Sequence, residues 1–296
     1  MIKKTLKGNH LTMTGFDPNE MIYAQINRVA PQKLWQAYIN DKKVVIDGKP
    51  LVKNQCVAMD ALLSVDLPIE KIDYSCDEQT MDVVYEDDAL LIVNKPKGII
   101  IYDITKDAKH TLCSHVAKYY HDTHQSHGIH YVHRLDKDTS GCCIFVKHQF
   151  FVANLDAQIR ERTLKRNYVA LAKGRIKQDM RIDKPIGRDR HDKKLRRIDP
   201  NGQQAVTDVK VLGYIGDDTL IQCDLHTGRT HQIRVHLASI NHPLVGDPWY
   251  GTPHKKGLAL HSYHVELIHP ITDETLQVRC RNIPFLSRKQ VETYLD

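Results

Sequence analysis

The segment His133-Arg134-Leu135-Asp136-Lys137-Asp138-Thr139-Ser140-Gly141 carries an arginine, two carboxylates and two hydroxyls on one short stretch of chain. Residues 128–132, ahead of it, are rich in β-forming side chains, and residues 142–146, behind it, form a short apolar run typical of a buried strand. The pattern predicts a polar loop held between two strands, which is a common setting for functional residues. An ordinary charged hairpin turn is the alternative, because Asp, Ser and Gly are frequent turn residues.

The chain as a whole has the composition of a globular protein. It has 296 residues, 41% of them hydrophobic, which is enough for one large domain or two smaller ones. No apolar run approaches the roughly 20 residues of a membrane helix, and the first residues lack the apolar core of a signal peptide. We therefore expect a cytoplasmic protein without membrane contact. Seven cysteines without a Cys-x-x-Cys pair indicate reduced thiols rather than a disulfide framework or a zinc site.

Positive charge is concentrated in two regions. The whole chain has a net charge of +6, yet residues 160–197 alone hold 15 Lys or Arg against 5 Asp or Glu, and residues 1–55 hold 9 against 4. Such clusters suit the phosphate backbone of a nucleic acid, because neutralising the phosphates releases counterions. A solvated basic face without a ligand is the alternative interpretation.

Residues 20–68 carry the pattern of a small separate module. Apolar side chains recur at helical spacing up to residue 39, with a break at Pro31, and a hairpin around Asp47-Gly48 and a closing strand follow. Two helices before such a hairpin resemble the S4 RNA-binding fold, although Asp47 stands where that family usually has Asn. We expect four regions in the chain: an extended lead-in over residues 1–20, an S4-like module over 21–70, a linker over 71–82 and a larger unit of helices and strands over 83–296.

The larger unit alternates predicted strands with three predicted helices. The helices are expected near residues 112–119, at 150–162 and at 230–240, the last with Thr230 as its N-cap. A basic loop is expected over residues 188–201. Strands are expected over residues 83–85, 89–93, 168–172, 206–212, 220–225, 259–268 and 275–281.

Two patterns resemble other kinds of site but fit them poorly. Histidines at 121, 124, 127, 130 and 133 recur every third residue, yet steps of three drift around a helix, so they do not share one metal-binding face. Asp136-x-Asp138-Thr139 resembles the motif of aspartate-nucleophile phosphatases, but His133-Arg134-Leu135 before it is unlike the buried strand of those enzymes. The sequence has no glycine-rich phosphate loop of the Rossmann or Walker type, so no cofactor is expected.

A second polar stretch, residues 225–238, contains an arginine that needs an anionic partner. Arg234 lies one helical turn from Thr230 and Ala238, beside the apolar face of the predicted helix. A carboxylate such as Asp136 would serve, and the pairing would keep that carboxylate ionised and oriented. A purely structural ion pair is the alternative.

Four motifs together resemble the RluA-type family of pseudouridine synthases. They are His133-Arg134-Leu135-Asp136-x-x-Thr139-Ser140-Gly141, Arg166-Asn167-Tyr168-Val169-Ala170, Thr227-Gly228-Arg229-Thr230-His231-Gln232-Ile233-Arg234-Val235-His236 and Gly246-Asp247-x-x-Tyr250-Gly251. The resemblance extends over residues 83–285 and implies an α+β fold with a mixed, largely antiparallel central sheet and flanking helices. It also implies an isomerase that detaches uracil from C1′ of its ribose, turns it and rejoins it through C5, without a cofactor or metal.

The resemblance implies a role for each matched residue. Asp136 corresponds to the aspartate required for catalysis, Tyr168 to the tyrosine that stacks on the target base, and Arg234 to the basic partner of the aspartate. Asp136 either attacks C1′ or removes the 2′ proton, and the sequence leaves both routes open. Arg134 corresponds to the arginine that helps to hold the flipped-out nucleotide. Further substrate-binding positions are expected at Thr139, Arg229, His231, Gln232, Lys193, Lys194, Arg196 and Arg197.

RNA is the expected partner of a monomeric protein. Ribosomal RNA of the large subunit is the first expectation and transfer RNA the second, whereas neither DNA nor a membrane is expected. Gln203 stands where a lysine commonly follows the glycine at 202, which removes one potential phosphate contact. Two other classes stay open: an RNA-binding or ribosome-assembly factor that keeps the fold without catalysis, and an aspartate-dependent hydrolase.

Overall fold

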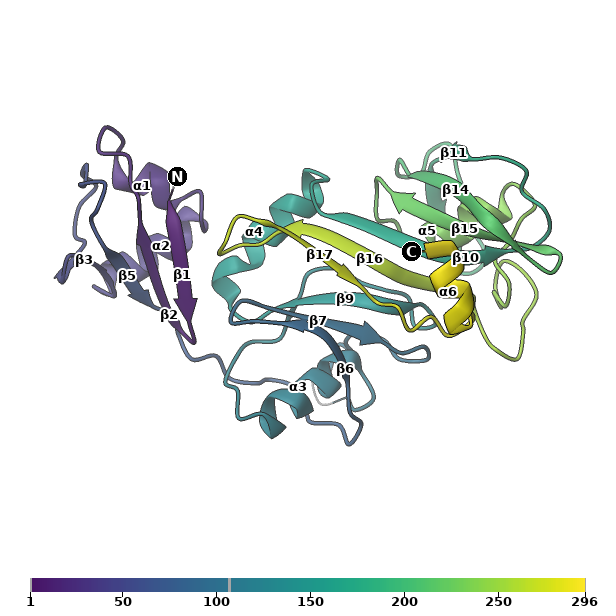
Figure 1. The fold of residues 1–296 in the computed structure, drawn as a ribbon, viewed down its shortest axis with the longest axis horizontal. Helices are drawn as coiled ribbons and strands as arrows, with labels where there is room; N and C mark the ends of the chain where they lie inside the picture. The colour runs from purple at the N-terminus through teal and green to yellow at the C-terminus, as the bar shows by residue number, and fades with distance from the viewer. Residues whose placement is uncertain (1, 106–107, 296) are drawn as a thin grey trace.

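Two β-sheets organise the chain (Figure 1). The computed structural model describes residues 2–105 and 108–295. Within them, a five-stranded sheet builds an N-terminal module and a 10-stranded sheet builds most of the rest. The α+β class and the largely antiparallel central sheet that the resemblance implied are confirmed. No helix of the described residues is both long and apolar enough to cross a membrane.

The N-terminal module combines two short helices with a sheet of order β1-β2-β5-β3-β4. Its elements are β1 (Lys3–Lys7), β2 (His10–Thr14), α1 (Ile22–Ile26), α2 (Gln32–Asn40), β3 (Val44–Ile46), β4 (Lys49–Pro50) and β5 (Leu63–Asp66). The predicted helices and hairpin are present. The predicted extended lead-in over residues 1–20 is wrong, because β1 and β2 pair with each other and β2 pairs with β5. Leu11 and Met13 are fully buried, so two alternating apolar side chains anchor this hairpin.

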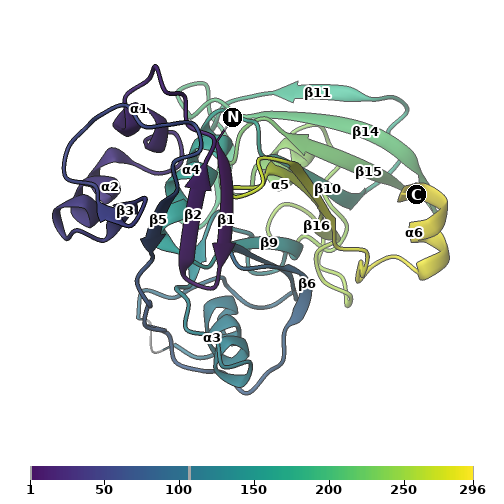
Figure 2. The ribbon, with the colours of Figure 1, turned by 60° about the vertical axis from the view of Figure 1, so that its left-hand side comes forward.

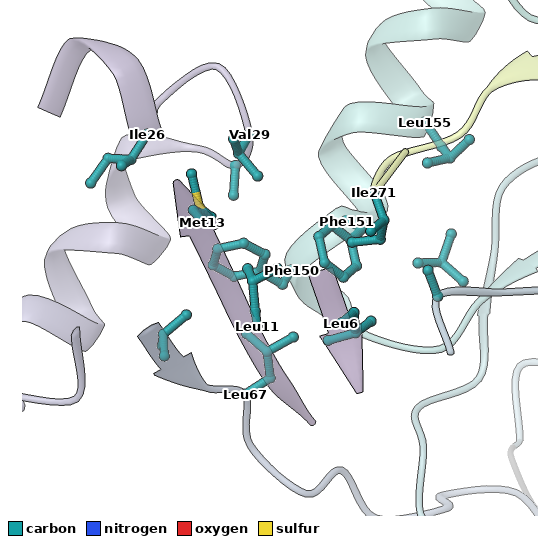
Figure 3. Close-up of a cluster of buried hydrophobic side chains, with 14 of the residues drawn as sticks. Leu6, Leu11, Met13, Ile26, Val29, Leu67, Phe150, Phe151, Leu155 and Ile271 are labelled. Atoms are coloured by element: carbon teal, nitrogen blue, oxygen red, sulfur yellow. The ribbon is translucent and has the colours of Figure 1, made fainter. Parts of the chain in front are cut away.

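A shared hydrophobic cluster joins the N-terminal module to the larger sheet (Figure 3). Leu6 and Met13 of the first hairpin are grouped with Phe150, at the start of helix α4 (Gln149–Arg160). The ring of Trp35 in α2 meets the ring of Phe150 edge-on, with 4.8 Å between the two centroids. Such aromatic pairs add about 0.5–1.5 kcal/mol beyond the area that they bury. The module is therefore packed onto the larger unit through an apolar interface.

Residues 71–81 connect the two sheets without regular secondary structure, yet they are fixed to helix α3 (Leu112–Asp122). The buried carboxylate of Asp77 accepts hydrogen bonds from the backbone N–H of His110 at 2.6 Å and from the Ser114 hydroxyl at 3.3 Å. Burial alone would raise the pKa of Asp77, but backbone hydrogen bonds such as the one from His110 lower it to about 2. The position of the domain boundary stays a prediction.

The large sheet has the strand order β11-β14-β15-β10-β16-β9-β7-β6, with β17 paired to β16 and β8 to β9. Its strands are β6 (Asp82–Glu86), β7 (Leu90–Lys95), β8 (His130–Tyr131), β9 (Ser140–Val146), β10 (Lys165–Ala172), β11 (Met180–Asp183), β14 (Val206–Ile215), β15 (Asp218–Leu225), β16 (Leu260–Ile268) and β17 (Thr275–Arg279). Its paired neighbours are antiparallel except β9 and β16, which run parallel. Strand β9, which follows the polar loop, is buried along its whole length.

Gly141 allows β9 and β16 to meet. Its φ angle is +112°, and a Cβ atom at this position would lie 2.2 Å from the carbonyl oxygen of Ser262 in β16. Ser262 pairs with Gly141 on one side and with Tyr168 of β10 on the other. The glycine at the end of the polar loop 133–141 therefore fixes that loop beside two further strands.

Helices lie around the large sheet, and one of them was not predicted (Figure 2). Helices α3 and α4 occur where helical spacing indicated them, and α6 (Arg288–Leu295) was not expected. The predicted helix over residues 230–240 is shorter, because α5 spans Gln232–Ala238. Thr230 is not its N-cap. That position belongs to His231, which has a left-handed φ of 58° and makes no side-chain capping bond.

The expected basic loop over residues 188–201 is partly wrong. Arg196–Ile198 form strand β13, which pairs with β12 (Ile186–Arg188) as a two-stranded hairpin. Alternation of apolar and basic residues is weak over so short a run, so the sequence pattern did not indicate these strands.

Replacing Phe150 by Ala should lower the free energy of unfolding by about 3–5 kcal/mol, because the substitution leaves a cavity between the module and the large sheet. Urea unfolding followed by circular dichroism measures this change. Ile268, which is 39% exposed at the end of β16, is the control, and its replacement by Ala should cost about 1 kcal/mol or less. Equal costs for the two substitutions would contradict a core shared by the module and the sheet.

Candidate active site

A cleft of about 1130 Å³ opens beside the polar loop and gathers residues from separate parts of the chain. Asp136 lies in the loop between β8 and β9, Tyr168 in β10 and Arg234 in α5. All three line the cleft, so the structure brings together the residues expected to carry catalysis. Their roles in catalysis stay predictions. The cleft is also lined by Arg134, Thr139, Arg196, Arg229, His231 and Gln232.

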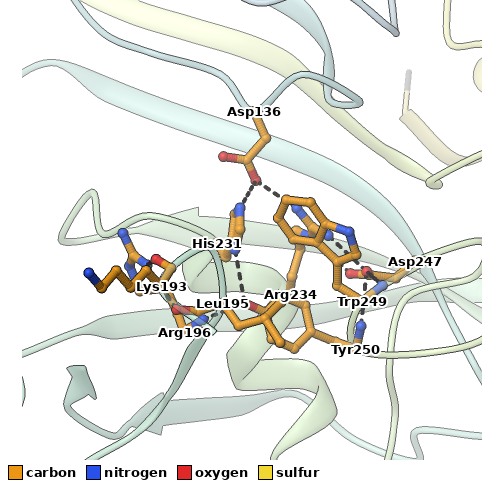
Figure 4. A network of polar contacts seen from close by, with 9 residues as sticks. All are labelled: Asp136, Lys193, Leu195, Arg196, His231, Arg234, Asp247, Trp249 and Tyr250. Carbon is orange, nitrogen blue, oxygen red and sulfur yellow. Dashed lines mark hydrogen bonds and ion pairs between the residues drawn. The ribbon is translucent and has the colours of Figure 1, made fainter. Parts of the chain in front are cut away.

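The guanidinium of Arg234 joins two carboxylates (Figure 4). Its Nε and Nη2 donate to Oδ2 and Oδ1 of Asp247, each at 2.8 Å, and its Nη1 donates to Oδ2 of Asp136 at 3.3 Å. Arg234 and Asp247 are buried, whereas Asp136 is partly exposed. The bidentate pair fixes the guanidinium, and the remaining nitrogen is directed at Asp136.

The pairing keeps both buried groups charged. Burial alone would lower the pKa of Arg234, but the hydrogen bonds and the charge of Asp247 outweigh burial and raise that pKa. Burial alone would raise the pKa of Asp247, but Arg234 and the backbone N–H groups of Trp249 and Tyr250 lower it. The indole of Trp249 also lies over Arg234, with its ring centroid 4.9 Å from Cζ, which adds a cation–π contact.

His231 approaches Asp136 from a second direction. Its Nε2 lies 3.9 Å from Oδ2 of Asp136, and its Nδ1 lies 2.8 Å from the hydroxyl of Tyr250. That hydroxyl accepts a hydrogen bond from the backbone N–H of Arg196 at 2.8 Å, so its own proton is available to Nδ1. Burial lowers the pKa of His231, which favours a neutral ring with its proton on Nε2, toward Asp136.

Tyr168 lines the deep part of the cleft. Its side chain is only 5% exposed, and burial raises the pKa of its hydroxyl, so the ring stays an uncharged phenol. Arg166, two residues earlier on the same strand, lines the same cleft. A flat, uncharged ring that lines the cleft together with Asp136 and Arg166 suits stacking on a pyrimidine base, and this role stays a prediction.

Gln232, through its side chain, and Thr139, through its backbone, form hydrogen bonds within the protein. The amide of Gln232 accepts from the backbone N–H of Arg229 at 3.0 Å and donates to the carbonyl of Val206 at 2.9 Å. Thr139 is buried, and its backbone N–H donates to the carbonyl of Asp136 at 3.1 Å. Both residues therefore shape the loops that carry Arg229 and Asp136, and their predicted contacts with substrate stay predictions.

The four residues of the β12–β13 hairpin that were expected to bind RNA differ in their exposure and in their ion pairing. Lys193 and Lys194 are exposed, and Arg196 reaches the cleft. Arg197 pairs with Asp199 at 2.7 Å, so its charge is already compensated. Of the four, Arg197 is thus the least suited to bind a phosphate.

Asp247 and Lys95 support the site, although the sequence patterns assigned neither of them a role. Nζ of the fully buried Lys95 donates to the carbonyls of Pro96 at 2.9 Å, Ile99 at 2.8 Å and Lys137 at 3.0 Å. Burial lowers the pKa of Lys95 to about 8. For Lys95, the signal in the sequence was a charged residue soon after the apolar run of residues 89–93, where a buried charge requires a partner.

The histidines at every third position do not gather in space. Within residues 2–105 and 108–295, no group of three or more His, Cys, Asp or Glu side chains is arranged to hold a metal ion. His121 is exposed near Asp122, whereas His133 is buried at the start of the polar loop.

Comparison with known proteins identifies the family. The sequence model described as RNA pseudouridylate synthase matches residues 89–239, which is more than half of the chain. The chain belongs to this family. The matched region contains the polar loop, Tyr168 and Arg234, whereas Asp247 lies beyond its end.

Individual relatives place this pseudouridine synthase in the RluA type. A Bacillus subtilis protein named uncharacterized RNA pseudouridine synthase YhcT is 38% identical over 253 residues, which are 83% of this chain and 84% of that protein. The ribosomal large subunit pseudouridine synthase D of Neisseria meningitidis serogroup A is 36% identical over 256 residues, 81% and 68% of the two chains. The solved structure of human RNA Pseudouridylate Synthase Domain Containing 1 matches with a TM-score of 0.58 and 26% identity, over 70% of this chain and 85% of that one. This protein is therefore an RNA pseudouridine synthase, an isomerase.

His133 makes the stability of this synthase depend on pH. Burial, together with the charge of Arg166, lowers the pKa of His133 to about 3, and its Nδ1 has no hydrogen-bond partner among the described residues. The unfolded chain has the ordinary histidine pKa of about 6.5, so it binds more protons than the folded protein below that pH. The contribution of the neutral His133 to the free energy of unfolding is thus fully present above about pH 6.5, and it is lost progressively as the pH falls toward 3.

Acidification from about pH 7.5 to about pH 5 should cost roughly 2 kcal/mol through His133 alone. Urea unfolding of the wild type and of His133→Asn at both pH values measures this contribution. The variant should lose about 2 kcal/mol less than the wild type on acidification, whatever its stability at the higher pH. The same loss in both proteins would contradict a buried neutral His133.

Proposed function

We propose that this synthase isomerises specific uridines of large-subunit ribosomal RNA and that the carboxylate of Asp136 starts the reaction without a cofactor. The observation that supports the proposal most directly is the position of Asp136, a partly exposed carboxylate 3.3 Å from a buried arginine in the main cleft. A carboxylate held by a charged donor stays available as a nucleophile or a base near neutral pH.

The reaction breaks the bond between N1 of uracil and C1′ of ribose and forms a bond between C5 and C1′. In one route Asp136 attacks C1′, uracil leaves with the bonding electrons, and C5 then attacks C1′ and displaces the carboxylate. In the other route Asp136 removes the 2′ proton as uracil leaves with the bonding electrons; C5 then adds to C1′ of the resulting glycal, and the proton returns from Asp136 to C2′. Both routes end with loss of the C5 proton. Arg234 and the Nε2–H side of His231 orient the carboxylate in either case.

The target base must leave its stack before Asp136 can reach C1′, at a cost of a few kcal/mol. Stacking on Tyr168 offsets part of this cost, and the exposed Arg134 beside the cleft is suited to hold the displaced nucleotide. Lys193 and Lys194, exposed between the two strands of the basic hairpin, are suited to the phosphate backbone.

Two observations support ribosomal RNA as the substrate class. The Neisseria meningitidis relative is named for the large ribosomal subunit and aligns over most of this chain. The N-terminal module resembles an S4 domain and carries the second basic region of the chain, residues 1–55. Because an apolar core packs this module onto the large sheet, a contact between the module and RNA would lie at a fixed distance from the cleft. Transfer RNA is the second candidate.

Tritium release tests the reaction, the catalytic carboxylate and the RNA class together. RNA labelled with tritium at uracil C5, as large-subunit ribosomal RNA and as transfer RNA in separate samples, is incubated with the wild type, with Asp136→Asn and with Asp138→Asn. Isomerisation must release the label, because C5 enters the new bond. The wild type and Asp138→Asn should release tritium from ribosomal RNA, whereas Asp136→Asn should lose about a thousandfold or more of the rate.

Each other outcome contradicts a stated part of the proposal. Substantial turnover by Asp136→Asn would refute the catalytic role of Asp136. Tritium release from transfer RNA alone would show that transfer RNA, and not ribosomal RNA, is the substrate class. Free uracil as the product would indicate a hydrolase. Retention of ribosomal RNA without any tritium release would indicate a binding or assembly factor. Filter binding of Asp136→Asn to the same RNA, expected to be close to that of the wild type, separates lost chemistry from lost binding.

A further inference from the structure

A second pocket opens between the β12–β13 hairpin and the start of α5, beside the catalytic cleft. Its volume is about 390 Å³, and the described residues that line it include neither a carboxylate nor an aromatic side chain. Three arginines that line this pocket also line the catalytic cleft, so the two spaces share a wall. The polar side chains of the pocket are Arg188, Arg196, Asn201, Gln203, Arg229 and Thr230.

The three arginines carry charge that no described residue compensates. Nη1 of Arg196 donates to two backbone carbonyls of its own hairpin, at 2.8 and 3.0 Å, and Nε of Arg229 donates to the carbonyl of Gln204 at 3.0 Å. These bonds orient two guanidinium groups without neutralising them. Neither they nor Arg188 form an ion pair with a described residue, whereas the neighbouring Arg197 pairs with an aspartate at 2.7 Å. Arg188 and Arg229 are exposed and Arg196 is partly exposed, so water can reach all three, and together they make the space attractive to an anion.

The pocket is built into the fold and connected to the catalytic residues. A Cβ atom on Gly202 would lie 2.5 Å from the carbonyl carbon of Ile186, so this glycine lets one wall pack directly on β12. On the other side, the backbone N–H of Arg196 donates to the hydroxyl of Tyr250, which contacts His231 beside the catalytic aspartate (Figure 4). An anion in the pocket is therefore held close to the reacting nucleotide.

We infer that Arg188, Arg196 and Arg229 form a subsite for one phosphodiester group of the RNA, next to the nucleotide whose uracil enters the cleft. The inference rests on the proposed RNA substrate. Guanidinium groups bind phosphate oxygens in a bidentate geometry, and the lack of an aromatic wall disfavours a stacked base as the occupant. The three arginines are positioning residues, since they hold the backbone while Asp136 meets C1′.

The salt dependence of RNA binding tests the subsite. A short fluorescently labelled oligouridylate is titrated with the full chain at several potassium chloride concentrations, using the wild type, Arg188→Gln, Arg229→Gln and the double variant. The slope of log K against log salt changes by about 0.7 for each phosphate contact of a single strand. The double variant should therefore have a slope shallower by about 0.7, because both residues serve one phosphate. Arg288→Gln, in the exposed last helix, is the control and should keep the wild-type slope.

Four results would overturn the subsite. They are an unchanged slope in the double variant, a decrease of about 1.4 as expected for two separate phosphates, an equal decrease in the Arg288→Gln control, and no salt-dependent binding by the wild type. Tritium release by the same proteins separates this inference from the proposed function. Wild-type release with an unchanged slope refutes the subsite alone, whereas the expected slope change without release refutes the proposed function alone.

Discussion

The buried ion pair between Arg234 and Asp247 is the interaction on which the active site depends. A guanidinium that is only 3% exposed is costly unless a carboxylate neutralises it, and Asp247 does so with two bonds of 2.8 Å. Breaking such a pair by removing one partner costs about 3–5 kcal/mol. Because Asp247 uses Nε and Nη2, Nη1 is left to meet Asp136. One buried pair thus orients the α5 helix, the loop after it and the carboxylate of Asp136.

The large sheet provides a second constraint, because its strand pairing fixes the position of Asp136 relative to Tyr168. Gly141, Ser262 and Tyr168 lie side by side on three neighbouring strands, so the end of the polar loop is in register with the aromatic ring. Lys95 adds a second tie, because its buried ammonium group holds the carbonyl of Lys137, the residue after Asp136. The carboxylate is therefore positioned from the sheet by backbone contacts and from α5 by charge.

Much of this arrangement could be predicted where the signal was local. The apolar run of residues 142–146 indicated the buried strand β9. Arg234 beside an apolar face indicated a carboxylate partner such as Asp136, which it does contact, although its bidentate partner is Asp247. Long-range pairing was harder to predict. The hairpin of residues 3–14 has only a few apolar side chains, and its pairing with β5 supplies the rest of its burial. Asp247 stands in one of the four motifs of the resemblance, but that motif did not indicate its partner Arg234, which lies 13 residues away and meets it only in the folded chain.

The most direct test of this account is a double-mutant cycle on the single-turnover rate of tritium release. Arg234→Lys removes the bidentate geometry but keeps the charge, and Asp247→Asn removes the charge that anchors the guanidinium. If Asp247 acts on Asp136 only through Arg234, each single variant loses about tenfold or more and the double variant is no slower than the slower single one, within about twofold. Rate losses that multiply in the double variant would contradict the account, because they would mean that Asp247 and Arg234 act on the reaction independently.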